Sequence, residues 1–383
     1  MIAIAEKRAI RLSKSSVGDA EAAALAEVIH DGRLGMGASV ASFENELAAF
    51  IGGARRVVCV NTGTSALHLA LQACGISAGD EVLVPTLTYV ASFQAISATG
   101  ATPVACDVRE SDCSLDVADA EKRITERTRA IMPVHYASGP GSLDEVYALA
   151  RRFNLRVIED AAHAFGCTRN GAPVGSTGDV VCFSFDGIKN ITAGEGGAIV
   201  TADEAVAQCA RDGRLLGVEN DTAQRLAGGR SWEFDVHQQG WRYHMSNLCA
   251  AIGRVQLGRL RGEFAPKRIQ IASLYQELFA ECLPACRVLP LRYGPIVPHI
   301  FPLVIENGTR DAVRRALLAD GVECGIHYKP NHLLSLYGGG RIPLPAAEAL
   351  YGKLLTLPLH PELETEDVER VAGIVKRALG VTV

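Results

Sequence analysis

The chain has 383 residues, of which 48% are apolar and 21% are charged, with a formal net charge of −5 at pH 7. This length is sufficient for two domains with buried cores, and the mild negative charge gives no electrostatic basis for binding nucleic acid. The segment from Met1 to Leu12 lacks the apolar region of a secretory signal, and no stretch approaches the roughly 18 uncharged apolar residues of a membrane helix. We therefore expect a cytoplasmic protein with no nucleic-acid or membrane partner.

Short apolar runs alternate with amphipathic stretches from about residue 17 to residue 200. The apolar runs predict strands at 56–60, 81–84, 102–106, 130–134, 156–158, 180–184 and 198–201. The intervening stretches predict helices that include 64–74, 89–98 and 144–153. Strands that alternate with helices favour an α/β sandwich around a mainly parallel sheet. In such a sheet the functional residues gather where the strands end.

The pattern changes after about residue 245. Helices are predicted at 248–260, 268–279, 310–319 and 366–379, with a short strand at 301–305 and a mobile glycine loop at 338–340. This mixture indicates a smaller α+β domain. We therefore divide the chain into a large cofactor-binding domain, residues 13–245, and a small C-terminal domain, residues 246–383, with which we group residues 1–12.

The eleven cysteines are scattered along the chain, and Cys59, Cys106 and Cys182 fall in predicted strands. No CxxC pair occurs, so the ligand spacing of a zinc site is missing. We interpret the cysteines as small buried thiols in a reducing compartment and predict no metal site.

The segment from Val180 to Val200, VVCFSFDGIKNITAGEGGAIV, is the strongest functional signal in the sequence. Its first strand ends at Ser184, Lys189 follows five residues later, and a glycine-rich stretch leads into the next strand. This order places the lysine amine at the functional edge of the sheet, where backbone can lie close to a ligand. An amine there can form a Schiff base with an aldehyde cofactor. The alternative is a solvated lysine in a surface loop.

Two carboxylates, Glu159 and Asp160, end the strand in the segment VIEDAAHAFG. A carboxylate at this position can pair with the protonated ring nitrogen of a pyridoxal cofactor, and that proton makes the ring an electron sink. Asp also favours the position that precedes a helix, so a pair of helix caps is an equal alternative.

The segment VNTGTSALHL, residues 60–69, places a turn at Gly63 before a helix that starts at Thr64 or Ser65. Hydroxyl and free N–H groups at a helix N-terminus form an anion site that a cofactor phosphate would fit, with a plain capped turn as the alternative. Neither a Walker loop nor a dinucleotide fingerprint is present. Tyr89, in the segment PTLTYVAS, follows another strand end and is placed to stack on a flat ring, although a lone aromatic residue more often packs in a core.

Together these segments resemble the DegT/StrS-type sugar aminotransferases, which are fold-type I enzymes that depend on pyridoxal 5'-phosphate. The resemblance extends from about Arg11 to the C-terminus. Its most specific parts are NTGTSALHLAL, GDEVLVPTLTYVAS, VIEDAAHAFG and SFDGIKNITAGEGG, and the later segments GIHYKPNH and LLTLPLHPEL also match. The resemblance implies a large αβα domain with a mainly parallel sheet and a smaller C-terminal α+β domain.

The resemblance also implies roles for individual residues. Lys189 would hold the cofactor and serve as the catalytic residue, Asp160 would pair with the pyridine nitrogen, and Tyr89 would stack on the ring. The remaining cofactor-binding positions are His163, beside the ring, and the phosphate ligands Thr64, Ser65 and Ser184.

One segment departs from the family pattern. The family usually reads G-x-N-x-R-M-S there, and the Asn reaches the cofactor phosphate of the partner subunit in a homodimer with shared active sites. In this chain, residues 240–246 read GWRYHMS, so Arg242 replaces the Asn and His244 replaces the Arg. Arg242 is therefore predicted to bind either the cofactor phosphate or a substrate diphosphate.

The reaction implied by the resemblance is amino transfer from a donor, expected to be glutamate, through pyridoxamine phosphate to a nucleotide-linked keto-deoxysugar. The HYKPNH segment favours a 4-keto-6-deoxyhexose, and His327 and Lys329 are predicted substrate contacts, with solvated loop residues as the alternative. The open alternatives are a 3-keto sugar nucleotide, a cyclitol ketone of the scyllo-inosose type, and a non-catalytic regulatory protein that binds pyridoxal phosphate. Retention of Lys189, where dehydratases of the family have a histidine, favours transamination.

Overall fold

A seven-stranded sheet forms the centre of the larger part of the computed structural model, which describes residues 8–52, 54–219, 221–226, 229, 233–338 and 341–381. The strand order is β1-β9-β8-β5-β4-β2-β3. Only β9 runs antiparallel to its neighbours, β1 and β8, so the sheet is mainly parallel as predicted. The strands are β1 (Arg56–Val60), β2 (Glu81–Pro85), β3 (Thr102–Cys106), β4 (Thr128–Ile131), β5 (Arg156–Asp160), β8 (Val180–Ser184) and β9 (Gly197–Thr201).

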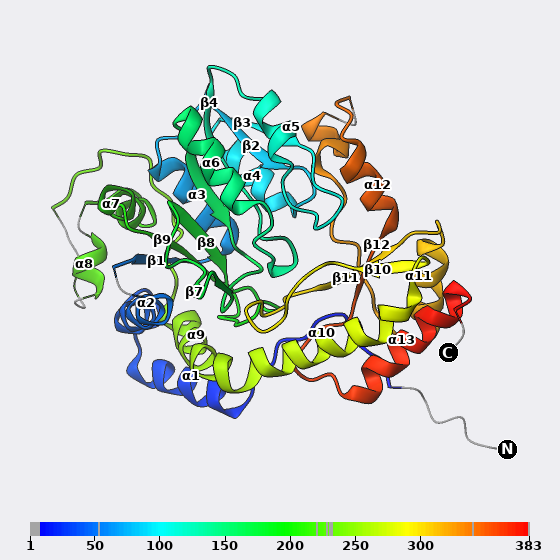
Figure 1. Cartoon of the computed structure of the whole chain (residues 1–383). Coiled ribbons are helices and arrows are strands. Elements are labelled where there is room, and N and C mark those ends of the chain that lie inside the picture. The colour runs from blue at the N-terminus through cyan, green and yellow to red at the C-terminus, as the bar shows by residue number, and fades with distance from the viewer. Residues whose placement is uncertain are drawn as a thin grey trace.

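Helices cover both faces of this sheet (Figure 1). On one face α3 packs between α4 and α7, and on the other α6 packs over β4 and β5. Neighbouring residues of one strand accordingly enter different buried clusters, as Val157 and Ile158 do in β5. The helices of this part are α1 (Asp19–Asp31), α2 (Ala38–Ile51), α3 (Gly63–Ala73), α4 (Val90–Ala98), α5 (Val117–Lys122), α6 (Leu143–Phe153), α7 (Glu204–Gly213) and α8 (Asp221–Leu226).

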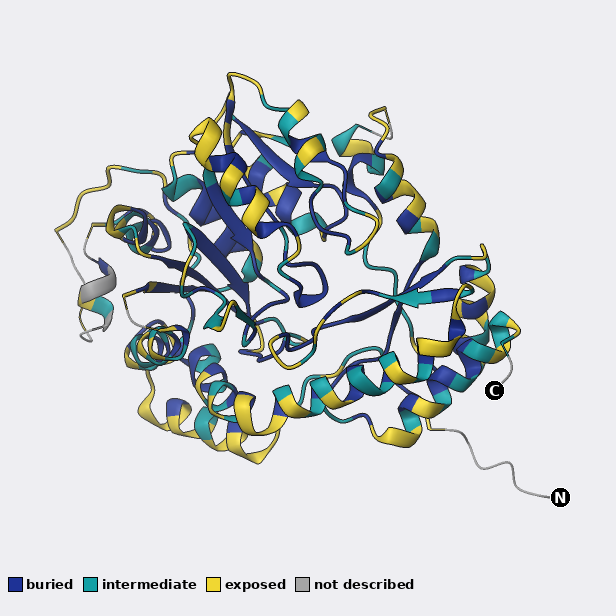
Figure 2. Ribbon diagram, viewed as in Figure 1, coloured by how far each residue is buried: buried dark blue, intermediate teal, exposed yellow. Residues whose placement is uncertain are grey.

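The central strands are apolar along their length because the sheet is covered on both sides. Every residue of β2, β8 and β9 is buried, and Figure 2 shows buried strands beneath helices whose outer faces are exposed. The short hairpin of β6 (Thr168–Arg169) and β7 (Ala172–Pro173) lies outside this sheet.

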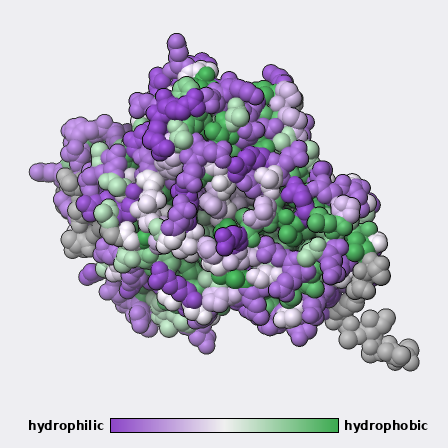
Figure 3. All heavy atoms as spheres, viewed as in Figure 1, coloured by the Kyte–Doolittle hydropathy of each residue, from purple (hydrophilic) through white to green (hydrophobic). Residues whose placement is uncertain are grey.

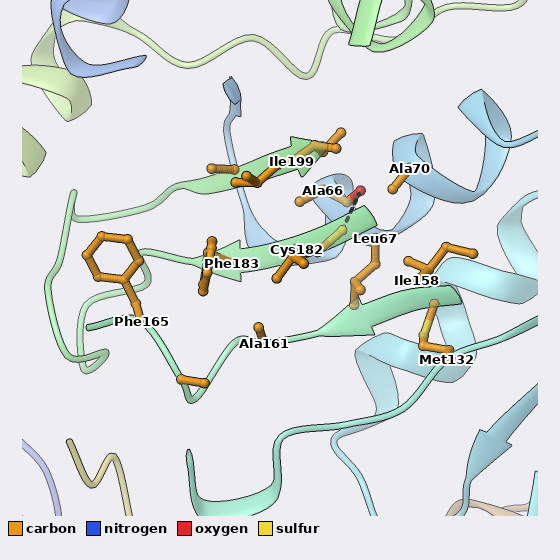
Figure 4. Packing of buried hydrophobic residues seen from close by; sticks show 14 of the residues in the cluster. Ala66, Leu67, Ala70, Met132, Ile158, Ala161, Phe165, Cys182, Phe183 and Ile199 are labelled. Atoms are coloured by element: carbon orange, nitrogen blue, oxygen red, sulfur yellow. Dashed lines mark hydrogen bonds between the residues drawn. The ribbon is translucent and has the colours of Figure 1, made fainter. Parts of the chain in front are cut away.

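Helix α3 lies directly against β8, as the close-up in Figure 4 shows. The Cys182 thiol of β8 donates to the carbonyl oxygen of Ala66 in α3, with the sulfur 3.6 Å from the oxygen. Cys59, Cys106 and Cys182 are all buried, and burial raises the pKa of each thiol. Their predicted role as buried thiols is confirmed. Within the described ranges, no cluster of three or more His, Cys, Asp or Glu residues is arranged to hold a metal ion.

The C-terminal part contains a three-stranded antiparallel sheet in the order β10-β11-β12, with helices on it. Its elements are β10 (Cys286–Val288), β11 (Phe301–Ile305), β12 (Leu354–Leu357), α10 (Ala265–Phe279), α11 (Arg310–Ala319), α12 (Pro345–Lys353) and α13 (Thr365–Leu379). Its core is a buried cluster separate from that of the large sheet and includes Tyr275, Phe279 and Phe301. Residues 8–12 lie along this part, because Ile10 forms a parallel bridge with Val322.

One long helical segment links the two parts. Helix α9 (Asn247–Arg259) packs on α1 and α2, and a π-helical turn, Leu260–Phe264, leads from it into α10. Figure 1 shows this segment crossing below both sheets.

The face in Figure 3 is mostly hydrophilic, with scattered apolar areas. No helix in the described part of the chain is long and apolar enough to span a membrane. Of the predicted glycine loop at 338–340, Gly339 and Gly340 lie outside the described residues.

Candidate active site

The ends of β1, β2, β5 and β8 surround one cavity of about 450 Å³. Most of the residues predicted from the sequence line this cavity, although they come from segments far apart in the chain. They are Thr64, Tyr89, Asp160, His163, Ser184, Lys189 and His327.

Lys189 lies in the loop that joins β8 to β9. The loop is closed at its base by hydrogen bonds from Phe185 N–H to Gly196 O (2.8 Å) and from Ala193 N–H to Phe185 O (2.9 Å). The Lys189 amine points to a buried histidine, with Nζ 3.4 Å from Nε2 of His299. Burial lowers the pKa of Lys189, although the charge of Asp160 acts to raise it. The amine therefore loses its proton more readily than a solvated lysine does.

Asp160 ends β5 and lines the cavity, with 6% of its surface exposed. One carboxylate oxygen accepts a hydrogen bond from the Ser92 hydroxyl of α4 (2.7 Å), and the other accepts from the N–H of Ala162 (3.2 Å). The carboxylate is thus held in one orientation at the floor of the site.

Glu159 is one residue earlier and does not line the cavity, because successive side chains of a strand point to opposite faces. Its carboxylate accepts from the Tyr147 hydroxyl (2.6 Å) and lies 2.7 Å from Nε2 of His135. Of the two carboxylates that the sequence offered, only Asp160 faces the cavity.

The N-terminus of α3 forms one side of the cavity. The first N–H groups of a helix have no partner within it, and Gly63 and Thr64 both line the cavity. A Cβ atom at Gly63 would lie 2.7 Å from Cβ and 2.9 Å from Oγ of Ser184. Glycine is therefore required for α3 to approach the end of β8 so closely, and the approach brings hydroxyl and N–H donors together.

Ser65 does not line the cavity, because its hydroxyl serves the helix cap. Its Oγ donates to Oδ1 of Asn61 (2.7 Å), and its N–H donates to Oγ1 of Thr62 (3.0 Å). The capped-turn alternative therefore describes Ser65, whereas Thr64 and Ser184 remain positioned for an anion.

Aromatic and imidazole rings form the opposite side of the site. The Tyr89 ring lies 5.9 Å from that of Tyr328, whose hydroxyl is 3.0 Å from Nε2 of His163. The His163 ring is in turn 4.5 Å from that of His299. Burial lowers the pKa of His163 and His299 well below the usual range, and that of His327 to about 4, so all three rings are neutral near pH 7.

Arg242 and Lys329 are exposed and do not line this cavity. The backbone of Arg242 nevertheless runs beside the segment that leads into α3, since Asn61 Nδ2 donates to its carbonyl oxygen (3.4 Å).

Several residues of the site were not predicted, among them three that contact predicted residues: His299, Tyr328 and Ser92. His299 precedes the buried strand β11 in an apolar segment without a motif, so nothing local in the sequence points to it. Tyr328 lies within GIHYKPNH, where only its neighbours His327 and Lys329 were interpreted as contacts of the site. Ser92 shares α4 with two other polar residues, Gln94 and Ser97, so nothing local in the sequence distinguishes it.

These features coincide with a known family. The sequence matches the DegT/DnrJ/EryC1/StrS aminotransferase family over residues 15–376. The chain belongs to this aminotransferase family. The fold-type I architecture predicted from the sequence is confirmed by its similarity to solved aminotransferases.

Three solved structures show how close that similarity is. The aminotransferase TlmJ from Streptoalloteichus hindustanus is 33% identical, with a TM-score of 0.89 over 97% of this chain and 99% of that one. The sugar aminotransferase CalS13 from Micromonospora echinospora is 29% identical, with a TM-score of 0.87 over 96% and 99% of the two chains. The PLP-form of Spr1654 from Streptococcus pneumoniae is 28% identical, with a TM-score of 0.89 over 97% and 99%.

Proposed function

We propose that the protein is a pyridoxal 5'-phosphate-dependent aminotransferase that transfers the amino group of glutamate to a nucleotide-linked keto-deoxysugar, in the favoured case a 4-keto-6-deoxyhexose. The observation that carries the proposal is the Lys189 amine, with its lowered pKa, in one cavity with Asp160 and the N-terminus of α3. The similarity to the sugar aminotransferase CalS13 and to the PLP-form of Spr1654 supports the sugar and the cofactor.

The residues of the cavity fit pyridoxal phosphate. The N-terminus of α3, where Gly63 and Thr64 line the cavity beside the Ser184 hydroxyl, suits a phosphate. Asp160 is held to pair with a protonated ring nitrogen, and Tyr89 would lie against the ring. The cofactor supplies an aldehyde that links to amines and a ring that withdraws electrons from the bond being broken.

Lys189 would hold and move the proton at Nζ. Its lowered pKa leaves more of the amine neutral and able to accept a proton from the donor's α-carbon. Because the rings of His163 and His299 are neutral, they carry no positive charge that would compete with the Lys189 amine for a carboxylate. His327 lines the cavity and is the proposed contact for the sugar, while Lys329, together with Arg242 of the partner subunit, would reach a substrate diphosphate from outside it.

We further propose a cytoplasmic homodimer with shared active sites, in which Arg242 of one subunit serves the site of the other. The exposed Arg242 side chain, beside but outside its own cavity, is the observation behind this proposal.

The first experiment is the half-reaction with glutamate, followed by the absorbance of the cofactor. Lys189→Ala should still bind the cofactor but should react at least about 10³-fold more slowly, because the proton-transferring amine is gone. Lys122→Ala, which removes an exposed lysine of α5, is the control and should react at the normal rate. A Lys189→Ala protein that turns over normally would overturn the proposal.

The second experiment identifies the acceptor. The pyridoxamine form would be mixed with dTDP-, UDP- and GDP-linked 3-keto and 4-keto sugars and with a cyclitol ketone, and recovery of the original absorbance would mark the substrate. A response to the cyclitol ketone alone would replace the nucleotide sugar in this proposal. Cofactor binding without any half-reaction with glutamate would instead indicate a regulatory protein.

A further inference from the structure

Arg268 of α10 is a buried arginine directly behind the site. It is 2% exposed and does not line the 450 Å³ cavity. Its Nη1 donates to the carbonyl oxygens of Pro298 and His299, each at 3.4 Å, and of Leu359 at 3.5 Å. Its Nη2 donates to the carbonyl oxygen of Lys189 at 3.5 Å. One guanidinium therefore joins the lysine loop to two segments of the C-terminal part.

No carboxylate forms an ion pair with this guanidinium in the part of the chain that the structure describes, and Nε has no hydrogen-bond partner there. Burial lowers the pKa of Arg268 to about 10, so the group is still charged at neutral pH. A buried charge without a counter-charge is costly, and carbonyl dipoles offset only part of that cost. Such a residue is therefore a candidate for a functional role.

The two residues whose carbonyl groups share this guanidinium also meet through their side chains. The backbone oxygens of Lys189 and His299 both accept from Arg268, and their side-chain nitrogens are 3.4 Å apart. Loss of the guanidinium would free both backbones to separate.

We propose that Arg268 is a positioning residue of the active site, which holds the backbones of Lys189 and His299 so that the lysine amine stays against the imidazole. The inference rests on the proposed role of Lys189. Because Arg268 does not line the cavity, it would touch neither substrate nor cofactor.

The charge of Arg268 acts on the amine together with several other groups. Burial lowers the pKa of Lys189 most, the carboxylates of Asp160 and Asp186 act to raise it, and Arg268 acts to lower it. The histidines that face the amine are His163, His299 and His327, whose pKa values lie below the usual range. The effect of Arg268 on the pKa of Lys189 is thus opposite to that of the two carboxylates.

Two variants separate the charge from the geometry. Arg268→Gln keeps amide N–H donors for the carbonyl groups but removes the charge, whereas Arg268→Lys keeps the charge but replaces the planar fork by a compact ammonium. Arg310 of α11, whose guanidinium pairs with Asp311 (2.6 Å), provides the controls for a buried arginine away from the site. It is also buried, donates to the carbonyl oxygens of Tyr351 (3.2 Å) and Leu354 (3.3 Å), and does not line the cavity.

The decisive measurement is the pH dependence of acylation at Lys189 in the cofactor-free protein, resolved by peptide mass spectrometry. Arg268→Gln should raise the labelling midpoint of Lys189 by a fraction of a pH unit, because the opposing charge is lost. Arg268→Lys should keep the midpoint near that of the wild type but lower kcat about tenfold at an unchanged KM for glutamate, because the amine is held less firmly. Arg310→Gln and Arg310→Lys should lose stability without either effect.

An unchanged midpoint in Arg268→Gln, or an equal shift in Arg310→Gln, would overturn the proposal. If Arg268→Gln does not fold, Arg268→Lys decides, and a normal kcat in that variant would also overturn it. Because the labelling uses protein without cofactor, it reports on the amine whether or not the chain transfers amino groups. A failed proposal for Arg268 is therefore distinguishable from a failed proposal for the reaction.

Discussion

Adjacent carboxylates at the end of β5 have opposite surroundings. Asp160 faces the cavity and is oriented by Ser92 and by the N–H of Ala162, whereas Glu159 is enclosed by Tyr147 and His135. The sequence showed that two carboxylates end this strand, but a period of two does not say which face carries the cavity. A difference of one position thus separates a proposed cofactor contact from a structural residue.

This difference predicts separable effects of two conservative changes. Asp160→Asn should fold normally but slow the half-reaction with glutamate by about 10²-fold or more, because an amide does not stabilise a protonated ring nitrogen. Glu159→Gln should retain that rate and lose about 1–2 kcal/mol of stability, since a buried hydrogen-bond acceptor is replaced. Half-reaction kinetics and denaturant unfolding of both variants test this, and a reversed pattern would contradict the assignment.

His327 predicts a dependence of stability on pH. Its pKa is lowered to about 4, first by burial and then by the charge of Lys189, whereas an unfolded histidine titrates near about 6.5. Between these values the unfolded chain binds a proton that the folded protein does not. The stability from the neutral ring is therefore complete above about pH 6.5 and is lost as the pH falls through about 4.

Denaturant unfolding across this range should show the loss of stability, of which His327 accounts for roughly 3 kcal/mol. His327→Gln should flatten the profile by about that amount. His30→Gln, which changes an exposed histidine of α1, should leave it unaltered. Equal profiles in the wild type and His327→Gln would show that the folded-state pKa of His327 is not lowered.

Among the elements, helix α3 begins very close to the end of β8. Gly63 has no side chain, and the helix N-terminus therefore lies against Ser184. The sequence predicted both the helix and the strand, and it predicted an anion site at their meeting. It did not predict that the Ser65 hydroxyl is used by the cap, because a hydroxyl at a helix N-terminus can serve either purpose.

Gly63→Ala should therefore weaken binding of pyridoxal phosphate. The new methyl group would lie 2.7 Å from Cβ of Ser184, so α3 must move away from β8 and the donors must separate. We expect at least a tenfold higher Kd, which absorbance titration can measure. Gly258→Ala in α9, where nothing lies within 4 Å of the added methyl, is the control and should bind normally with a small gain in helix stability. A normal Kd in Gly63→Ala would contradict this account.

For the whole molecule, local patterns predicted the strands of the central sheet and the helices α3, α4 and α6 beside it, because apolar runs and helical periodicity are visible within a short window. The orientation of β9 was not predicted, because pairing with β1 joins segments far apart in the sequence. His299 was missed for a related reason, since it reaches Lys189 only when the C-terminal part lies against the large sheet. The division at residue 245 remains a prediction.

The proposed homodimer predicts complementation between inactive subunits. Lys189→Ala and Arg242→Ala proteins should each be poorly active, and exchange of their subunits should restore sites in which Lys189 and Arg242 are both intact. Activity measured after mixing and partial unfolding tests this, with light scattering to confirm a dimer. Mixtures no more active than their components would show that Arg242 does not serve the site of a partner.

The pairing of β1 with β9 determines how late the central sheet can be completed during synthesis of the chain. β1 lies at the edge of the sheet and has β9 as its neighbour. In the sequence, however, β1 is the first strand of this sheet and β9 is the last. A ribosome that releases the chain from its N-terminus therefore exposes β1 and the start of α3 long before their neighbours exist. Any ligand held between α3 and β8 can bind only after the chain has been synthesised past Thr201. Ligand binding at this site would thus mark a nascent chain whose central sheet is complete, and it cannot assist the earlier steps of folding.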